Sequence, residues 1–180
     1  PLPFFHAFAV LVFVMNVAAG GNGVVIHERF DPEAVLRDFV RYGVTVFFGV
    51  PTMYSYLLDA FDPARHEAGK FKLRLGVTGA APVPVHVMRE FEKKFGMTII
   101  EAYGQTESCG GITFERIDRE RKVGSCGHAL PGLEVKIVDD KDNEVPHGEM
   151  GEIIMRGPTT MKGYWNMPDA NAEVFRNGWL

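Results

Sequence analysis

The sequence predicts an α/β fold. A parallel βαβ-type sheet with flanking helices is expected over residues 1–122, followed by a small β-rich, barrel-like subdomain over residues 123–180. In the first part, short β-branched or aromatic runs alternate with segments whose apolar residues recur at helical spacing, a pattern typical of parallel sheets covered by helices. In the second part the apolar residues alternate one by one, which favours half-exposed antiparallel strands.

The first apolar segment runs from Ala7 to Ala19 and contains no charged residue. It is too short to span a bilayer, which takes ~20 residues, and it lacks the positive start and cleavage site of a signal peptide. We interpret it as a buried core helix and expect no transmembrane segment. Because the chain begins at Pro1 without methionine and stops at Leu180, both ends are expected to be cuts through a larger protein.

Three further helices carry start signals. Asp31-Pro32 supplies an N-cap acid followed by proline at the first helical position, and Gly43 ends that helix. Pro51 and Pro84 open the other two. The apolar stripes expected to face the core are Val35, Leu36, Phe39 and Val40 in the first, Tyr54, Leu57, Leu58 and Phe61 in the second, and Val85, Met88, Phe91 and Phe95 in the third.

Strands are expected between these helices and after them. The run 44–48 has no charge and predicts a strand buried on both faces. The runs 73–78 and 97–102 complete the parallel part, whereas 133–138 and 152–156 fit the β-rich part.

Composition excludes several classes of function. With 46% hydrophobic and 23% charged residues the chain is an ordinary globular protein. A net charge of -4 gives no electrostatic footprint for nucleic acid, and no basic run favours an anionic membrane. Cys109 and Cys126 lack metal-ligand spacing, so a reducing, cytoplasmic setting is expected, either free or peripheral to a membrane. Cys109 is interpreted as a small packed thiol rather than a nucleophile.

Two glycine-containing loops follow predicted strand ends, where open α/β sheets bind ligands. They are Thr78–Pro82 and Tyr103–Ser108. Tyr103 could stack on a base, Thr106 could bond a phosphate oxygen, and Glu107 could hold Mg²⁺. Taken alone, the first loop is more usually a plain strand-to-helix turn, and the Thr-Glu pair is more usually a helix cap. On these residues alone both interpretations stay open.

The complete set of motifs resembles the adenylate-forming superfamily, which includes acyl-CoA synthetases, aryl-CoA ligases, luciferases and peptide-synthetase adenylation domains. Val77–Pro82 and Tyr103–Ser108 carry the resemblance. Further segments that agree in order are Pro1–His6, Gly49–Thr52, Gly124–Gly127 with Pro131-Gly132, and Gly148–Ile153 with Arg156-Gly157 and Gly163–Asn166. The chain looks like an internal piece of the N-terminal domain of an acyl-CoA synthetase, such as a long-chain fatty-acid–CoA ligase.

The resemblance implies an ATP-dependent acid–thiol ligase. A carboxylate, expected to be a fatty acid, attacks the α-phosphorus of ATP, and coenzyme A then takes the acyl group and releases AMP. The implied partners are therefore small molecules, with Mg²⁺ as cofactor. Because the superfamily's phosphate loop, ribose-binding aspartate and C-terminal lysine are not found in the 180 residues, we expect this chain alone to be inactive.

The resemblance also assigns roles to individual positions. The nucleotide-binding residues would be Gly79, Ala80, Ala81, Tyr103, Gly104, Gln105 and Thr106, with the adenine between the first loop and Tyr103. Thr106 would contact the α-phosphate, Glu107 would coordinate Mg²⁺, and His6 would orient the carboxylate. Without the resemblance, His6 would be interpreted as a core histidine bonded to the backbone.

The acyl pocket is expected among residues that would equally suit an ordinary core. These are Phe5, Phe47, Phe48, Val50, Val77, Gly104, Cys109 and Gly110.

Three alternatives stay open for the function. An aryl-acid ligase would use the same motifs. An amino-acid-adenylating domain usually carries an acid for the substrate ammonium, and none is identified here. A non-catalytic binding domain of the same fold is disfavoured by the intact Thr106 and Glu107. A dimer is also expected, induced by truncation, because open sheet edges pair between copies.

Overall fold

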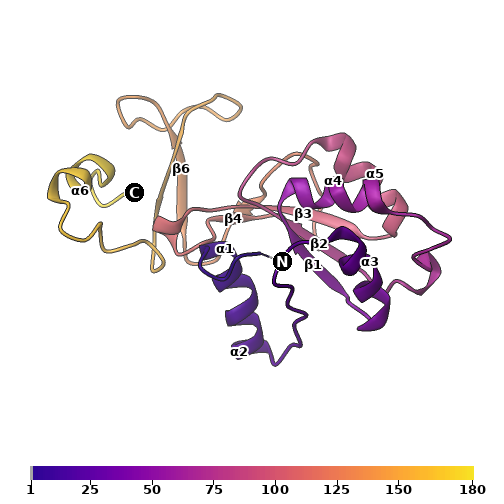
Figure 1. Ribbon diagram of the computed structural model, residues 1–180. Helices are drawn as coiled ribbons and strands as arrows, with labels where there is room; N and C mark the ends of the chain where they lie inside the picture. The colour runs from indigo at the N-terminus through magenta and orange to yellow at the C-terminus, as the bar shows by residue number, and fades with distance from the viewer. Residues whose placement is uncertain (1) are drawn as a thin grey trace.

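The computed structural model describes residues 2–180 (Figure 1), so that Pro1, the first residue of the histidine motif, lies outside the described residues. The larger sheet of the described part has the strand order β1-β2-β3-β4-β5. β1, β2 and β3 are parallel, and β4 and β5 continue the sheet antiparallel. The strands are β1 Val46–Gly49, β2 Leu75–Thr78, β3 Thr98–Tyr103, β4 Thr113–Phe114 and β5 His128–Ala129. The predicted parallel α/β plan is confirmed.

The three helices with start signals are confirmed as α3 Pro32–Arg41, α4 Pro51–Ala60 and α5 Val85–Phe95. Asp31 caps α3, since its Oδ1 accepts hydrogen bonds from the backbone N–H groups of the second and third helical residues. One stripe residue was wrongly predicted, because Val85 is 40% exposed while Val87 is buried. Val85 is the first residue of α5 and lies beside Gly124, outside the core.

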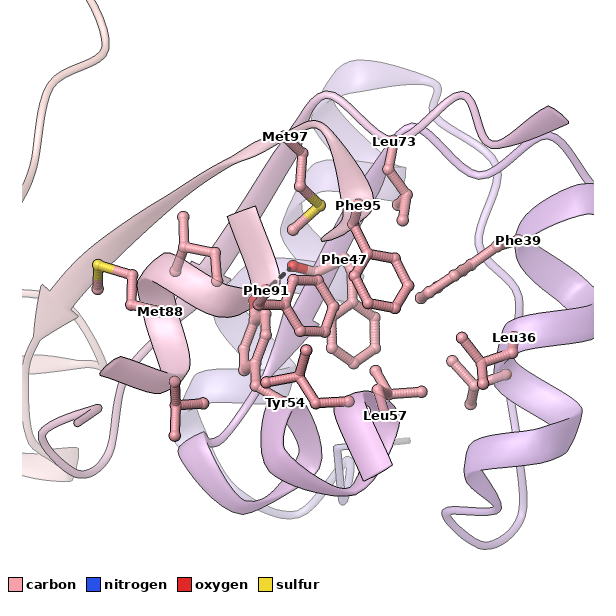
Figure 2. Packing of buried hydrophobic residues seen from close by; sticks show 14 of the residues in the cluster. Leu36, Phe39, Phe47, Tyr54, Leu57, Leu73, Met88, Phe91, Phe95 and Met97 are labelled. Carbon is pink, nitrogen blue, oxygen red and sulfur yellow. Dashed lines mark hydrogen bonds between the residues drawn. The ribbon is translucent and has the colours of Figure 1, made fainter. Parts of the chain in front are cut away.

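The core lies between the sheet and the helices α3, α4 and α5, and aromatic rings fill it (Figure 2). The ring centroids of Tyr54 and Phe91 are 4.9 Å apart, and those of Phe91 and Phe95 are 4.0 Å apart. The buried Tyr54 hydroxyl lies 3.2 Å from the carbonyl oxygen of Phe47 and 3.1 Å from that of Val77. A polar group inside the core is thereby satisfied, and α4 is fixed against β1 and β2.

The edge strand β1 differs from its prediction as a strand buried on both faces. Phe47 and Gly49 are buried, but Val46 and Phe48 are only partly so. Among the described residues no strand pairs with the outer side of β1. A groove of about 720 Å³ lies along that side and is lined by Val46 and Phe48. The apolar side chains of the strand are therefore only partly buried by neighbouring segments.

The N-terminal apolar segment is helical but is not the buried helix that was predicted. It consists of α1 Ala7–Ala9, the π-helical segment η1 Val10–Met15 and α2 Asn16–Gly20. Ala9 and Val12 are buried, whereas Val10 and Val17 are 37% and 40% exposed. The ring of Phe13 packs edge-on against Phe48 of β1, with centroids 5.5 Å apart, and α2 projects away from the sheet (Figure 1). No described helix is both long and apolar enough to cross a bilayer.

The predicted β-rich part contains the antiparallel pair β6 Glu134–Val138 and β7 Glu152–Arg156, followed by α6 Pro168–Val174. The chain end returns to this pair, because the backbones of Met155 and Leu180 exchange hydrogen bonds of 2.8 and 2.9 Å. The division at residues 122 and 123 stays a prediction. β5 lies beyond that division and pairs with β4 of the larger sheet. Two short 3₁₀ helices, η2 Ala68–Lys70 and η3 Thr106–Ser108, complete the elements.

Candidate functional site

A cavity of about 270 Å³ lies at the carboxyl ends of β2 and β3. Segments far apart in the sequence line it, among them the helix start around His6, the loop after β2 with Gly79 and Ala80, and the residues from Tyr103 to Glu107 at the end of β3. The two glycine-containing loops therefore meet on one cavity. This is where ligands collect in open α/β sheets.

The loop after β2 brings its backbone close to β3. A Cβ on Gly79 would lie 3.0 Å from the carbonyl oxygen of Ala102, so a larger residue would push the loop away. Ala80 has φ 67°, a left-handed conformation that is uncommon for alanine. Ala81 is exposed and does not contribute to the lining of the cavity. A residue with a backbone conformation like that of Ala80 often occurs at functional sites.

The loop after β3 is a closed turn. The Ser108 hydroxyl accepts from the backbone N–H of Gln105 at 3.2 Å and donates to the carbonyl oxygen of Gln105 at 2.8 Å. The backbone N–H of Gly110 also donates to the Gln105 carbonyl, at 3.0 Å. A Cβ on Gly104 would lie only 1.7 Å from the carbonyl oxygen of Gly110. The turn therefore excludes every side chain at position 104.

Glu107 links this loop to a segment more than fifty residues later in the sequence. Its carbonyl oxygen accepts from the backbone N–H of Met161 at 2.8 Å. The Tyr164 hydroxyl donates to its Oε1 at 2.7 Å, and this hydrogen bond raises the pKa of Tyr164. No hydrogen bond from a described residue to Oε2 is found. Sequence reasoning missed Tyr164, although its place beside Gly163 in a recognised motif was a usable signal.

His6 begins α1 and lines the same cavity. Its Nδ1 accepts from the backbone N–H of Phe8 at 3.2 Å, so the neutral ring carries its proton on Nε2. The alternative interpretation of His6 as a core histidine bonded to the backbone is confirmed for the hydrogen bond and wrong for the burial, because His6 is exposed. His6 can therefore present an N–H donor to a ligand.

The family model for AMP-binding enzymes matches residues 1–165. The chain belongs to the AMP-binding enzyme family.

This AMP-binding chain is 38% identical over 179 residues to a feruloyl-CoA synthase of Amycolatopsis sp, covering 99% of the chain and 36% of that protein. It is 34% identical over 180 residues to a long-chain-fatty-acid–CoA ligase of Escherichia coli O6:H1, covering 99% of the chain and 32% of that protein. The chain thus spans about a third of the length of these relatives.

The fold of this AMP-binding chain is that of solved CoA ligases. It is similar to O-succinylbenzoate coenzyme A synthetase from Bacillus subtilis in complex with ATP and magnesium ion. That comparison has a TM-score of 0.83 and 33% identity, and it covers 99% of this chain and 36% of the other.

The candidate acyl residues of this AMP-binding chain do not gather at one place. Gly104 and Gly110 line the cavity, whereas Phe47 and Phe48 line the groove along β1. The remaining candidates, none of which lines the cavity, are Phe5 at 91% exposed, the half-buried Val50, Val77 at 2% exposed, and the exposed Cys109.

Cys109 is not the small packed thiol that was predicted. It follows η3 with φ 56°, and its side chain is exposed. Because the turn after Ser108 needs a left-handed residue to end it, the chain direction there turns the thiol outward. Packing of a cysteine depends on this local backbone geometry, which composition does not reveal.

The lining of the cavity can hold a metal only together with a ligand. Within residues 2–180 no group of three or more His, Cys, Asp or Glu side chains could hold an ion. Among the described residues, Glu107 is the one carboxylate that lines the cavity. Mg²⁺ is often bound by one or two carboxylates and the phosphates of a substrate. The donor set therefore fits a nucleotide-bound Mg²⁺.

Proposed function

We propose that the chain forms the adenylate-binding part of an ATP-dependent acid–thiol ligase. Such an enzyme would join a carboxylic acid to AMP and then transfer the acyl group to coenzyme A. The observation that carries the proposal is the meeting of the loops at Ala80 and Tyr103 on one cavity at the carboxyl edge of the sheet. The two relatives, a feruloyl-CoA synthase and a long-chain-fatty-acid–CoA ligase, support it.

In this proposal the adenine lies between the two loops. Gly79 and Ala80 offer close backbone on one side, with Ala81 at the rim, and the Tyr103 ring stacks on the other. Gly104 and Gln105 belong to the same turn and fix the position of Tyr103. A preformed turn of this kind reduces the ordering cost of binding.

The phosphate end is assigned to the acidic end of the second loop. The Thr106 hydroxyl is exposed beside the cavity and would donate to an α-phosphate oxygen, while Glu107 would hold Mg²⁺. When bound, the ion would offset the negative charge that repels an incoming carboxylate.

The proposed first step joins the carboxylate to the α-phosphorus. One carboxylate oxygen forms a bond to phosphorus, the bond from phosphorus to the bridging oxygen breaks, and pyrophosphate leaves. The His6 Nε2–H would orient the carboxylate by donating a hydrogen bond. The coenzyme A thiol, after losing its proton, then attacks the acyl carbon, and AMP leaves. Positioning of this kind supplies much of the rate enhancement in such transfers.

The acid is proposed to be a simple carboxylic acid. Among the described residues lining the cavity, Glu107 is the one acid, and it is assigned to the metal, so no second carboxylate faces a substrate ammonium. A fatty acid is favoured by the phenylalanines of the β1 groove, including Phe48. An aryl acid is the second candidate, because one relative is named a feruloyl-CoA synthase. A cytoplasmic setting is proposed from Cys109 and Cys126, which are both free.

The nucleotide site is tested by NMR titration of the isotopically labelled 20.0 kDa chain with ATP and Mg²⁺. We expect shifts in both loops and binding weakened about tenfold by Tyr103→Ala, the effect of losing one stacked base contact. Tyr42→Ala is the control, because Tyr42 is 54% exposed and lies outside the cavity lining. Equal weakening by both variants, or shifts that leave both loops unaffected, would contradict the proposal.

The activity is tested by acid-dependent pyrophosphate release. Because the chain spans about a third of its relatives, we expect no turnover from the 180 residues alone. A longer protein that carries the chain should release pyrophosphate with long-chain or aryl acids, and a panel of both decides the class. Release with amino acids in preference to both would overturn the assignment of the substrate.

A further inference from the structure

The proposed metal-binding carboxylate receives two hydrogen bonds from a distant segment. Tyr164 donates from its hydroxyl to Oε1 of Glu107 at 2.7 Å, and Met161 donates from its backbone to the Glu107 carbonyl at 2.8 Å. Both donors follow β7, more than fifty residues after Glu107. The β-rich part of the chain therefore fixes both the backbone and the side chain of Glu107.

Tyr164 is itself held on its other side. The Asn171 side chain of α6 accepts from the Tyr164 backbone N–H at 2.6 Å and donates to the Tyr164 carbonyl at 2.9 Å. A Cβ on Gly163 would lie 2.9 Å from Asn171 Oδ1, so the preceding glycine permits this close approach. The hydroxyl is thereby presented to Glu107 from a fixed backbone.

The donors to Glu107 leave its charge intact. Both are neutral, and among the described residues no ion pair includes Glu107. One carboxylate oxygen is bonded and the other has no described partner. An oriented, uncompensated carboxylate oxygen is what a hard cation requires, whereas a lysine or arginine partner would compete with the ion.

We propose that Tyr164 is a positioning residue, which orients the Glu107 carboxylate so that Oε2 binds the Mg²⁺ of the bound nucleotide. This inference rests on the proposed function. It assigns to the β-rich part a task at the nucleotide site, and it makes α6 the support of that task through Asn171.

The test measures ATP binding to the whole chain by NMR titration, with and without Mg²⁺, for wild type, Tyr164→Phe and Tyr56→Phe. Tyr56→Phe is the matched control, because Tyr56 is 56% exposed and remote from the cavity lining. We expect Tyr164→Phe to bind metal-free ATP with the affinity of wild type. The factor by which Mg²⁺ increases the affinity for ATP should be about tenfold smaller in this variant, the effect of losing one hydrogen bond to a charged group. Asn171→Ala should reduce the same tightening by a smaller factor.

The outcomes separate this inference from the proposed function. ATP binding that Mg²⁺ tightens equally in wild type and Tyr164→Phe would overturn the role of Tyr164 and leave the nucleotide site standing. Equal loss of binding with and without Mg²⁺ in Tyr164→Phe would also overturn it, because Tyr164 would then only support the fold. A wild-type chain that binds no ATP in either condition would overturn both proposals.

Discussion

At the scale of single residues, Gly104 shows how one position can fix a site. The turn after β3 folds back so closely that a Cβ at 104 would meet the carbonyl oxygen of Gly110 at 1.7 Å. The backbone fixes where a Cβ lies, and the carbonyl oxygen is part of the backbone, so no side-chain rotation can relieve the overlap. The direction of Tyr103 and Glu107 therefore depends on the absence of a side chain between them.

We expect Gly104→Ala to lower the free energy of unfolding by about 2–3 kcal/mol, the usual cost of forcing extra volume into a packed place. ATP binding should weaken in the same variant, because the turn must open. Urea denaturation and NMR titration measure the two effects. Gly69→Ala is the control, since a Cβ there has no neighbour within 4 Å. If Gly104→Ala behaved like this control, the turn would not need the glycine.

The role of a single residue could be predicted where its neighbours in the sequence determine it. The loops with Gly79 and Tyr103 could be found because small residues and polar groups stood directly after strand-like runs. The motif around Gly163 pointed to Tyr164 but not to its partner, because the hydrogen bond to Glu107 joins residues 57 apart in sequence. The exposure of Cys109 depends on a positive φ, which no pattern in the sequence announces.

At the scale of elements, a buried pair of acids joins β3 to the segment after β4. Glu115 is 6% exposed and its Oε2 accepts from the backbone N–H of Glu101 at 3.3 Å. Burial raises the pKa of the Glu115 carboxyl, and repulsion by Glu101 and Glu92 adds to this. The hydrogen bond from Glu101 and the attraction of Arg121 act in the opposite direction and are outweighed.

Glu115→Gln should therefore stabilise the fold at pH 7. A raised folded pKa means that ionisation costs stability, and this cost begins above the ordinary pKa of 4.5 and is complete above the folded value. The gain of the variant over wild type should shrink as the pH falls through that window. Urea denaturation between pH 4 and pH 8 measures it, with the exposed Glu149→Gln as control. A variant less stable than wild type at pH 7 would refute the argument.

The positions of the helices could be predicted better than the extent to which neighbouring segments bury each strand. Asp31-Pro32 and Gly43 marked α3 because caps act within one turn of the chain. The burial of β1 and of the N-terminal helix was overestimated, because apolar composition records a preference for burial, while cover depends on which neighbours are present. Val10 and Phe48 are apolar residues of this kind with incomplete cover.

At the scale of the whole molecule, we propose different roles for two edges of the sheet. The carboxyl ends of β2 and β3 form the cavity proposed to bind the nucleotide, and Tyr164 of the β-rich part donates a hydrogen bond to Glu107 of its lining. The outer side of β1 has no strand partner among the described residues and borders a groove of about 720 Å³ that is lined by both apolar and polar side chains. Edge strands of this type pair readily with other chains.

We expect the chain to self-associate through β1, which agrees with the dimer predicted from its sequence. Val46 lines the groove and lies on the open strand, so Val46→Lys should place a charge where a second strand would pair. Sedimentation velocity should then show a mainly monomeric variant whose ATP binding is unchanged, because β1 does not line the cavity.

The control is Ile117→Lys, which places the same charge on an exposed apolar residue that does not line the groove. If self-association were caused by exposed apolar surface in general, both lysine variants would reduce it alike. Reduction by Val46→Lys alone would assign it to the β1 edge, where backbone donors and acceptors without a strand partner can pair with a second copy. Self-association and nucleotide binding would then belong to separate edges of one sheet, and each could be removed without the other.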